Sequence, residues 1–200
     1  YPEPGEGPAS STSATDPDGE RLVHTGQVLD ERYRLDRCLY RRAGTETWLG
    51  FDQMLSRPVL LHVLAPDDPR TLEILDEARK AAPATDSRFL RVLDAVLVED
   101  EPHGSYIVCE YAPGQSLELA LKHGPLTEAE AAWMVRELAD GLIGMHAQGL
   151  YHRELNPDTV VITASGNVKI VGFLVEAALH PDADDTTPGE QLDVEGLGKV

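Results

Sequence analysis

The chain has 200 residues, 42% of them hydrophobic, which is enough to bury one substantial core or two small lobes. Its 17 basic residues stand against 35 acidic ones, and the formal net charge of −18 repels phosphate backbones and anionic lipid surfaces. Nucleic acid is therefore not expected as a partner, and neither is direct contact of this segment with a membrane.

Cysteine usage and hydropathy indicate the compartment. Cys38 and Cys109 lie far apart, each in an apolar run, which is typical of buried thiols in a reducing environment rather than of a disulfide framework. The sequence contains no run of about 18 apolar residues and no basic-then-apolar leader. We therefore expect this segment to be soluble and cytoplasmic.

Residues 1–24 differ in composition from the rest of the chain. They are rich in Pro, Gly, Ser, Thr and acidic residues and poor in large apolar side chains, so we expect a disordered linker. This composition, together with a first residue other than Met, favours a domain taken from a longer polypeptide to which the stretch is a tether. We expect residues 22–29 to pack the end of the linker onto the lobe that follows.

Residues 25–112 predict a small sheet lobe. Alternating or continuous apolar runs predict five strands, at 33–39, 45–51, 58–64, 89–98 and 105–110. Between the third and fourth strands, residues 69–82 place Leu72, Leu75 and Ala78 at helical spacing, and Asp68 is the expected N-cap.

Residues 113–200 predict a mainly helical lobe. A short helix is expected at 117–122, and a longer one begins at Thr127, where the sequence TEAE forms a capping box. Gly149 ends the longer helix. The apolar face of that helix consists of Met134, Leu138, Leu142 and Met145. Two later runs, 159–162 and 168–171, predict a hairpin around a Ser-Gly-Asn turn.

Three short motifs follow one another in the second lobe. Residues 152–159 read HRELNPDT, residues 171–174 read VGFL, and residues 193–198 read DVEGLG. In this order they resemble the catalytic-loop, metal-binding and anchoring-helix motifs of bacterial Ser/Thr protein kinases. The resemblance covers roughly residues 25–200. It implies an α+β, bilobal protein-kinase-like fold, with a five-stranded antiparallel N-lobe (25–112) and a C-lobe (113–200) that is incomplete at its C-terminus.

Kinase chemistry requires glycines over the phosphates, a strand lysine paired with a helix glutamate, an aspartate base, and Asn and Asp on the metal ions. The resemblance places Tyr40 and Arg42 where the first two glycines would be, and their bulk would block close approach of the backbone to phosphate. His62, shorter than lysine and mostly neutral at pH 7, replaces the strand lysine. Its acidic partner is retained as Glu77.

The catalytic and metal-binding motifs are altered as well. Glu154 replaces the aspartate base, keeping a carboxylate at greater reach, and Asn156 replaces the lysine two residues later. Thr159 replaces the metal-binding Asn, Gly172 the metal-binding Asp, and Leu174 the glycine after it. No carboxylate is left at the second motif to hold magnesium between phosphates.

Residues that hold the kinase fold together are retained, in contrast to those that do chemistry. The retained positions are Glu77, His152, Arg153, Phe173 and Asp193. This selective loss indicates a structured domain with a non-catalytic role, so we expect a pseudokinase rather than an enzyme, with no ATP, metal ion or other cofactor.

Several residues have plainer alternatives. His62, His146 and His152 are more typical of satisfied core histidines than of pH sensors. The acids Asp182, Asp184 and Asp185 lie in a loop rich in Pro and Gly, where solvated charge is a simpler reading than a metal site.

Three threonines are candidates for phosphorylation by another kinase. They are Thr15, Thr186 and Thr187, which lie in polar loop sequence. An acid stands three residues after Thr15, a spacing that some phosphothreonine-binding domains favour. For each of the three, an ordinary loop threonine is the plainer reading.

The motifs HRELNPDTVVI and VGF further resemble the intracellular pseudokinase domain of the mycobacterial MviN family of lipid II flippases. That resemblance implies a domain on the cytoplasmic side of the membrane, part of a larger membrane protein of peptidoglycan synthesis. It also implies that an upstream Ser/Thr kinase phosphorylates a threonine, after which a forkhead-associated domain protein docks and restrains precursor export. Two alternatives stay open: a divergent Ser/Thr phosphotransferase or nucleotide sensor, and a phosphorylation-independent dimerisation module.

Overall fold

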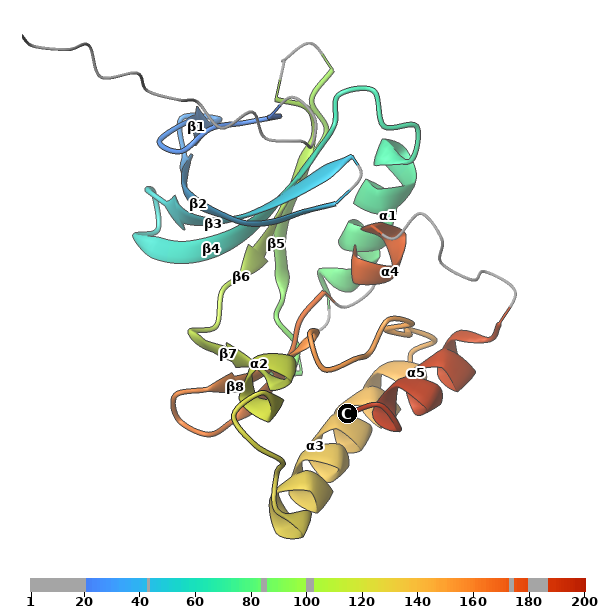
Figure 1. Ribbon diagram of the computed structural model, residues 1–200. Helices are drawn as coiled ribbons and strands as arrows, with labels where there is room; N and C mark the ends of the chain where they lie inside the picture. Colours follow the sequence, from blue (N-terminus) through green and yellow to red (C-terminus); the bar gives the residue numbers. More distant parts are fainter. Residues whose placement is uncertain (1–20, 43, 84–85, 100–102, 173–174, 180–186) are drawn as a thin grey trace, which may run out of the picture.

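The computed structural model describes residues 21–42, 44–83, 86–99, 103–172, 175–179 and 187–200. These residues form an antiparallel sheet with one helix beside it, above a second lobe of helices and a small sheet (Figure 1). This is the bilobal, protein-kinase-like arrangement that the sequence predicts.

The upper sheet is antiparallel, with the strand order β1-β2-β3-β4-β6-β5. The strands are β1 (Val28–Leu29), β2 (Tyr33–Arg42), β3 (Thr45–Asp52), β4 (Arg57–Leu64), β5 (Val92–Val96) and β6 (Tyr106–Glu110).

The sequence predicts five strands here, and the structure has one more within the described residues. Asp30 and Glu31 take positive φ angles of 48° and 54°, so the chain turns sharply and residues 28–29 pair with β2. β5 is shorter than expected, because Phe89 forms a separate parallel bridge with Ile170 of the lower lobe. Burial of Val23 and Leu29 confirms that residues 22–29 pack onto the sheet.

Helix α1 (Thr71–Ala81) lies beside the sheet and buries Ile74, Leu75 and Ala78. Leu72 belongs to the helix as predicted, but its side chain does not share the buried face and is 65% exposed. Asp68 is not the N-cap either. Its carboxylate accepts the backbone N–H of Arg70 at 2.9 Å and forms the turn before the helix.

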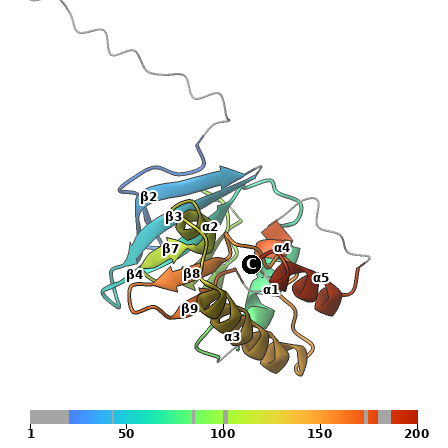
Figure 2. The ribbon, with the colours of Figure 1, turned by 60° about the horizontal axis from the view of Figure 1, so that its bottom comes forward.

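The lower lobe contains a small sheet and most of the helices. Its elements are β7 (Gly114–Ser116), α2 (Leu117–Leu121), α3 (Glu128–His146), β8 (Val160–Thr163), β9 (Val168–Ile170), α4 (Val175–Leu179) and α5 (Gly189–Leu197). The predicted β8–β9 hairpin is confirmed. β7 is unexpected; it needs Gly114, because a Cβ there would lie 2.4 Å from the carbonyl oxygen of Ile162. Seen from below, the small sheet lies beside α3 (Figure 2).

Helix α3 begins as the sequence predicts. Thr127 accepts the N–H of Glu130 at 3.3 Å, and the Glu130 carboxylate accepts the N–H of Thr127 at 2.9 Å. This reciprocal pair satisfies N–H groups that have no partner within the helix. The predicted apolar face is buried along its length, at Met134, Leu138, Leu142 and Met145.

One large core joins the two lobes. It contains residues of α1, β4 and β6 from above and of α2, α3, β8, β9 and α4 from below, while a smaller core lies on the outer face of the upper sheet. Both cysteines are free; Cys109 is buried as expected, but Cys38 is only half-buried. Within the described ranges, no helix has the length and apolar character needed to cross a membrane.

Candidate functional site

The candidate site lies between the lobes, around residues 152–159, and Asp193 of α5 holds it from below. The buried Asp193 carboxylate accepts the backbone N–H of His152 at 2.9 Å and that of Arg153 at 2.6 Å. It also hydrogen-bonds Nε2 of His146 at 2.7 Å. Arg153 has a φ of 69°, an unfavourable conformation for a residue with a side chain, and the bond to Asp193 helps to hold it.

His152 connects this loop to the end of β9. Its Nε2 lies 2.8 Å from the carbonyl oxygen of Val171, and its Nδ1 lies 3.3 Å from the backbone nitrogen of Glu154. Because a carbonyl oxygen can only accept and a backbone N–H can only donate, these partners assign the donor role to Nε2 and the acceptor role to Nδ1. His152 is therefore a buried histidine whose two nitrogens are both used by the fold.

The resemblance places Asn156 and Thr159 where kinases have a lysine and a metal-binding Asn. In the structure both side chains hydrogen-bond within the loop itself. The Thr159 side chain is buried, and its hydroxyl accepts the N–H of Asn156 at 3.0 Å and lies within donating distance of the Asn156 carbonyl at 3.0 Å. The Asn156 amide donates to the carbonyl of Glu154 at 3.0 Å and accepts the N–H of Asp158 at 2.9 Å. Both side chains therefore stabilise the turn.

Glu154, expected at the position of the catalytic base, is half-buried. Its backbone is used by His152 and Asn156. Its carboxylate has no hydrogen-bond or ion-pair partner among the described residues. Of the candidate site residues that the structure describes, it alone keeps an acidic group without a hydrogen-bond or ion-pair partner.

The resemblance places His62 and Glu77 at the positions of the kinase lysine–glutamate pair. In the structure each hydrogen-bonds to another residue. The His62 ring is buried in β4, and its Nδ1 lies 3.1 Å from the hydroxyl of Thr47 on β3. Glu77 instead accepts from Lys80 on its own helix at 2.8 Å, and Lys80 also pairs with Asp76 at 2.9 Å. The hydrogen bonds that the Lys80 ammonium donates to Glu77, and next to Asp76, raise its pKa above its usual range.

Tyr40 and Arg42, expected in place of two glycines, lie at the end of β2 and are exposed. The Arg42 guanidinium stacks over the Tyr40 ring, 5.2 Å from its centroid. Burial and a hydrogen bond with Glu118 raise the pKa of Asp158 above its ordinary value, and the positive charges of Lys122 and Arg42 oppose that rise. Arg42 of the upper lobe is therefore close enough to act on the charge of Asp158 in the lower loop, a proximity the sequence does not reveal.

The remaining candidate residues are less informative. Gly172 is buried with a φ of 78°, and Thr187 is half-buried just before α5. The expectations for Phe173 and Leu174, for the candidate phosphosites Thr15 and Thr186, and for the acids Asp182, Asp184 and Asp185 fall outside the described residues. In the part of the chain that is described, no three His, Cys, Asp or Glu side chains come together in a way that could hold a metal ion.

A cavity of about 580 Å³ lies elsewhere, and none of the residues expected to carry kinase chemistry lines it. The site between the lobes therefore has to be judged from its side chains rather than from the presence of a cavity.

Comparison with known proteins shows which family this geometry belongs to. The family model of the protein kinase domain matches residues 74–189, more than half of the chain. Among curated proteins, the chain is 32% identical over 161 residues to the serine/threonine-protein kinase PknA of Mycobacterium tuberculosis, covering 77% of this chain and 37% of that protein. It is 30% identical over 169 residues to the serine/threonine-protein kinase pkn2 of Myxococcus xanthus, covering 81% of this chain and 20% of that protein.

Solved structures support the fold. The PknI kinase domain of Mycobacterium tuberculosis superposes with a TM-score of 0.68 at 23% identity, covering 88% of this chain and 74% of the PknI chain. A second structure of that domain gives a TM-score of 0.64 at 24% identity, covering 76% of this chain and 62% of the other. The chain spans between a fifth and somewhat over a third of the length of the curated relatives it matches.

Proposed function

The chain belongs to the protein kinase domain family, and from this premise we propose that it is a catalytically inactive pseudokinase domain acting as a phosphorylation-dependent regulatory scaffold. The observation that carries the proposal is how the fold uses His62, Asn156 and Thr159. Each has a side chain unlike the one that kinase chemistry needs, and each is hydrogen-bonded within the protein.

Phosphoryl transfer depends on positioning and on neutralising the charge of the triphosphate with metal ions and a lysine. An imidazole hydrogen-bonded to Thr47 replaces the ammonium, and a buried hydroxyl replaces a metal-binding carbonyl. Gly172 has no side chain to offer a metal ion. These features support a site that neither binds ATP with magnesium nor transfers phosphate.

The scaffold part of the proposal rests on the resemblance to the MviN family. An upstream Ser/Thr kinase phosphorylates a threonine, with Thr15, Thr186 and Thr187 as candidates, and a forkhead-associated domain protein then docks. A phosphothreonine adds nearly two negative charges and three acceptor oxygens, which Arg side chains and backbone N–H groups of a partner can bind. In this proposal the domain lies on the cytoplasmic side of the membrane, within a larger membrane protein, and controls export of the peptidoglycan precursor.

The test is phosphothreonine mapping by mass spectrometry on the protein isolated from its own cells, combined with capture by a forkhead-associated domain. We expect at least one phosphothreonine, and we expect capture to be lost after phosphatase treatment. Alanine at the mapped threonine should abolish capture, whereas alanine at a neighbouring, unphosphorylated threonine should not. Capture that is equally strong before and after phosphatase treatment would refute the scaffold mechanism.

Three observations favour a second candidate, a divergent phosphotransferase or nucleotide sensor. The Glu154 carboxylate is uncommitted among the described residues, and Arg42 brings a positive charge toward the lower loop. The matched relatives are also named as serine/threonine kinases. Transfer of labelled phosphate from ATP by the purified chain, abolished by Glu154→Gln and not attributable to a contaminating kinase, would establish this candidate over the first.

A further inference from the structure

The cavity of about 580 Å³ lies behind the segment that links the two lobes, on the outer face of the upper sheet. Val108 of β6 belongs to the outer core, whereas Cys109 belongs to the core shared by the lobes, so Glu110 returns to the outer face. Leu93 of β5, which also lines the cavity, packs against the outer core. Thr163 and Lys169 of the β8–β9 hairpin complete the lining from the lower lobe, so the cavity spans both lobes and includes none of the candidate residues of the site between them.

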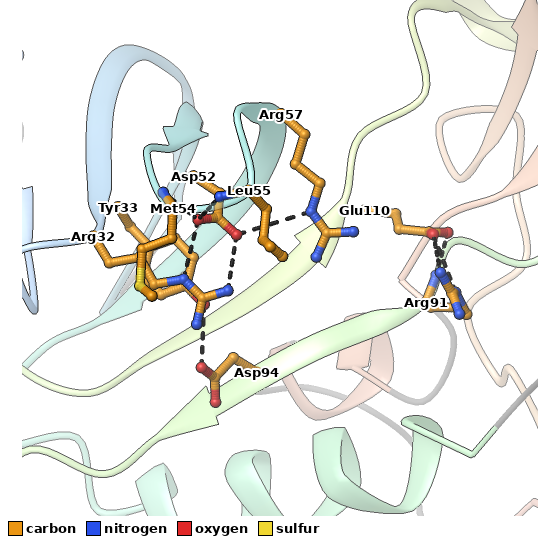
Figure 3. A network of polar contacts seen from close by, with 9 residues as sticks. All are labelled: Arg32, Tyr33, Asp52, Met54, Leu55, Arg57, Arg91, Asp94 and Glu110. Carbon is orange, nitrogen blue, oxygen red and sulfur yellow. Dashed lines mark hydrogen bonds and ion pairs between the residues drawn. The ribbon is translucent and has the colours of Figure 1, made fainter.

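Arg57 is the distinctive side chain of this cavity. Its side chain is 36% exposed, and its Nε is buried without a hydrogen-bond acceptor among the described residues. The nearest acid is Asp52, whose Oδ2 lies 3.9 Å from that nitrogen (Figure 3). A guanidinium has five N–H donors in a planar fork that matches a carboxylate or phosphate.

Asp52 pairs with Arg57 only at long range, because 3.9 Å is beyond hydrogen-bond length and both carboxylate oxygens accept from closer donors. Arg32 binds it in a bidentate way at 3.0 and 2.8 Å, and the backbone N–H groups of Met54 and Leu55 donate to Oδ1 at 3.1 and 3.2 Å (Figure 3). Arg57 thus forms a long ion pair with an acid whose hydrogen bonds go to other donors.

The other charged groups of the cavity leave it cationic. Glu110 is neutralised by Arg91, whose Nε and Nη2 donate to one of its oxygens at 3.0 and 2.7 Å. Lys169 donates to the carbonyl oxygen of Ser87, and an ammonium has two further protons to offer. Arg57 and Lys169 therefore give this cavity a locally positive surface, although the chain has a net charge of −18.

The remainder of the lining is largely apolar and includes Leu93, Ala112 and Pro113. A bare inorganic anion would leave this surface uncovered, and a purely apolar ligand would leave Arg57 without an acceptor. We propose that the cavity docks a peptide segment of a partner protein, with an acidic side chain bound by Arg57 and Lys169 and a neighbouring apolar side chain on Leu93 and Pro113. The volume lies within the range of small-ligand sites and takes a few residues.

This docking uses none of the candidate residues of the site between the lobes. It applies whether or not that site takes nucleotide, and whether or not a threonine is phosphorylated.

The experiment is selection of random dodecapeptides displayed on phage against the 200-residue chain. Selected peptides are synthesised with a fluorescent label and titrated by polarisation. We expect an Asp or Glu within two or three residues of a Leu, Ile or Pro. We also expect affinity to fall by about tenfold or more in Arg57→Gln, because a charge-assisted bidentate bond is lost. Lys169→Gln should weaken binding less, because an ammonium binds as a point charge.

Arg37→Gln is the matched control, since Arg37 is an exposed arginine of the same lobe that does not line the cavity, and it should leave affinity unchanged. Peptides that bind Arg57→Gln as tightly as the unaltered chain would overturn the proposal. So would displacement of the peptides by benzoate at equal concentration, which would assign the cavity to a small carboxylate. A dimer in sedimentation velocity that Arg57→Gln dissociates would also overturn it, by assigning the cavity to a second copy.

Discussion

Replacing Asp193 with alanine should destabilise the domain more than any other single change in α5. The Asp193 carboxylate accepts the backbone N–H groups of His152 and Arg153 and binds the ring of His146. Removing it leaves buried N–H groups without an acceptor and releases the constraint on Arg153, whose φ is 69°.

The magnitude follows from these contacts. Each buried donor that loses its acceptor costs about 1–3 kcal/mol, and hydrogen bonds to a charged group are at the upper end of that range. Relaxation of the His146 ring, whose side chain is 16% exposed, should recover part of the loss. We therefore expect Asp193→Ala to lower the free energy of unfolding by about 3–5 kcal/mol, a large share of the 5–15 kcal/mol that is typical of a domain. Asp193→Asn keeps one acceptor oxygen and should cost about half as much.

The assay is urea unfolding followed by tryptophan fluorescence and circular dichroism. Glu195→Ala is the matched control, because Glu195 is exposed on the same helix and bonds only Gln191 among the described residues, so its loss should stay within about 0.5 kcal/mol. A loss below about 1 kcal/mol for Asp193→Ala, or equal losses for the two variants, would refute the conclusion that Asp193 anchors the loop.

Three further predictions concern other parts of the fold. Gly196→Ala should destabilise α5, because the added Cβ would lie 2.5 Å from the Leu155 carbonyl oxygen. Gly144→Ala in α3 is the control: its Cβ meets nothing within 4 Å, so it should stabilise the domain by about 0.5–1 kcal/mol in thermal unfolding. Thr159→Val should cost about 1–2 kcal/mol by leaving buried loop groups unpaired, while Thr159→Ser keeps the hydroxyl and should cost clearly less in urea titrations. The side-chain hydrogen bonds from Arg32, assisted by backbone N–H groups, lower the pKa of Asp52. The stabilising contribution of Asp52 is therefore complete above its unfolded pKa of about 3.9 and is lost as pH falls through its folded pKa. Asp52→Asn should flatten the decline in the free energy of unfolding below about pH 4. An unchanged decline in that pH range would contradict this.

Features set by local spacing could be predicted from the sequence. The capping box at Thr127 and the hairpin around Gly166 depend on residues within a few positions of one another, and the structure has both. The errors occurred where side-chain direction or tertiary contact decides. Leu72 fits a helical spacing but lies on the exposed side of α1, and β7 exists because Gly114 allows β8 to approach closely.

The candidate site was less accessible from sequence, because its key contacts join distant segments. The motifs indicate Asp193, but they do not indicate that the ring of His146 hydrogen-bonds to its carboxylate. Bulk at Arg42 was evident, yet its proximity to Asp158 depends on how the lobes face each other. The sequence shows that a threonine stands at position 159, but it does not show that this side chain hydrogen-bonds within its own loop. An exposed threonine would look the same in the sequence.

Thermal unfolding of the chain in increasing ATP with magnesium or manganese tests whether the site between the lobes binds nucleotide with a divalent ion. A ligand at 100 times its dissociation constant adds about 2.7 kcal/mol, which for a domain of this size raises the melting temperature by roughly 5–10 °C. We expect no rise beyond that caused by the same concentration of the divalent ion with inorganic phosphate. A saturable rise of several degrees that requires both ATP and the ion would contradict it.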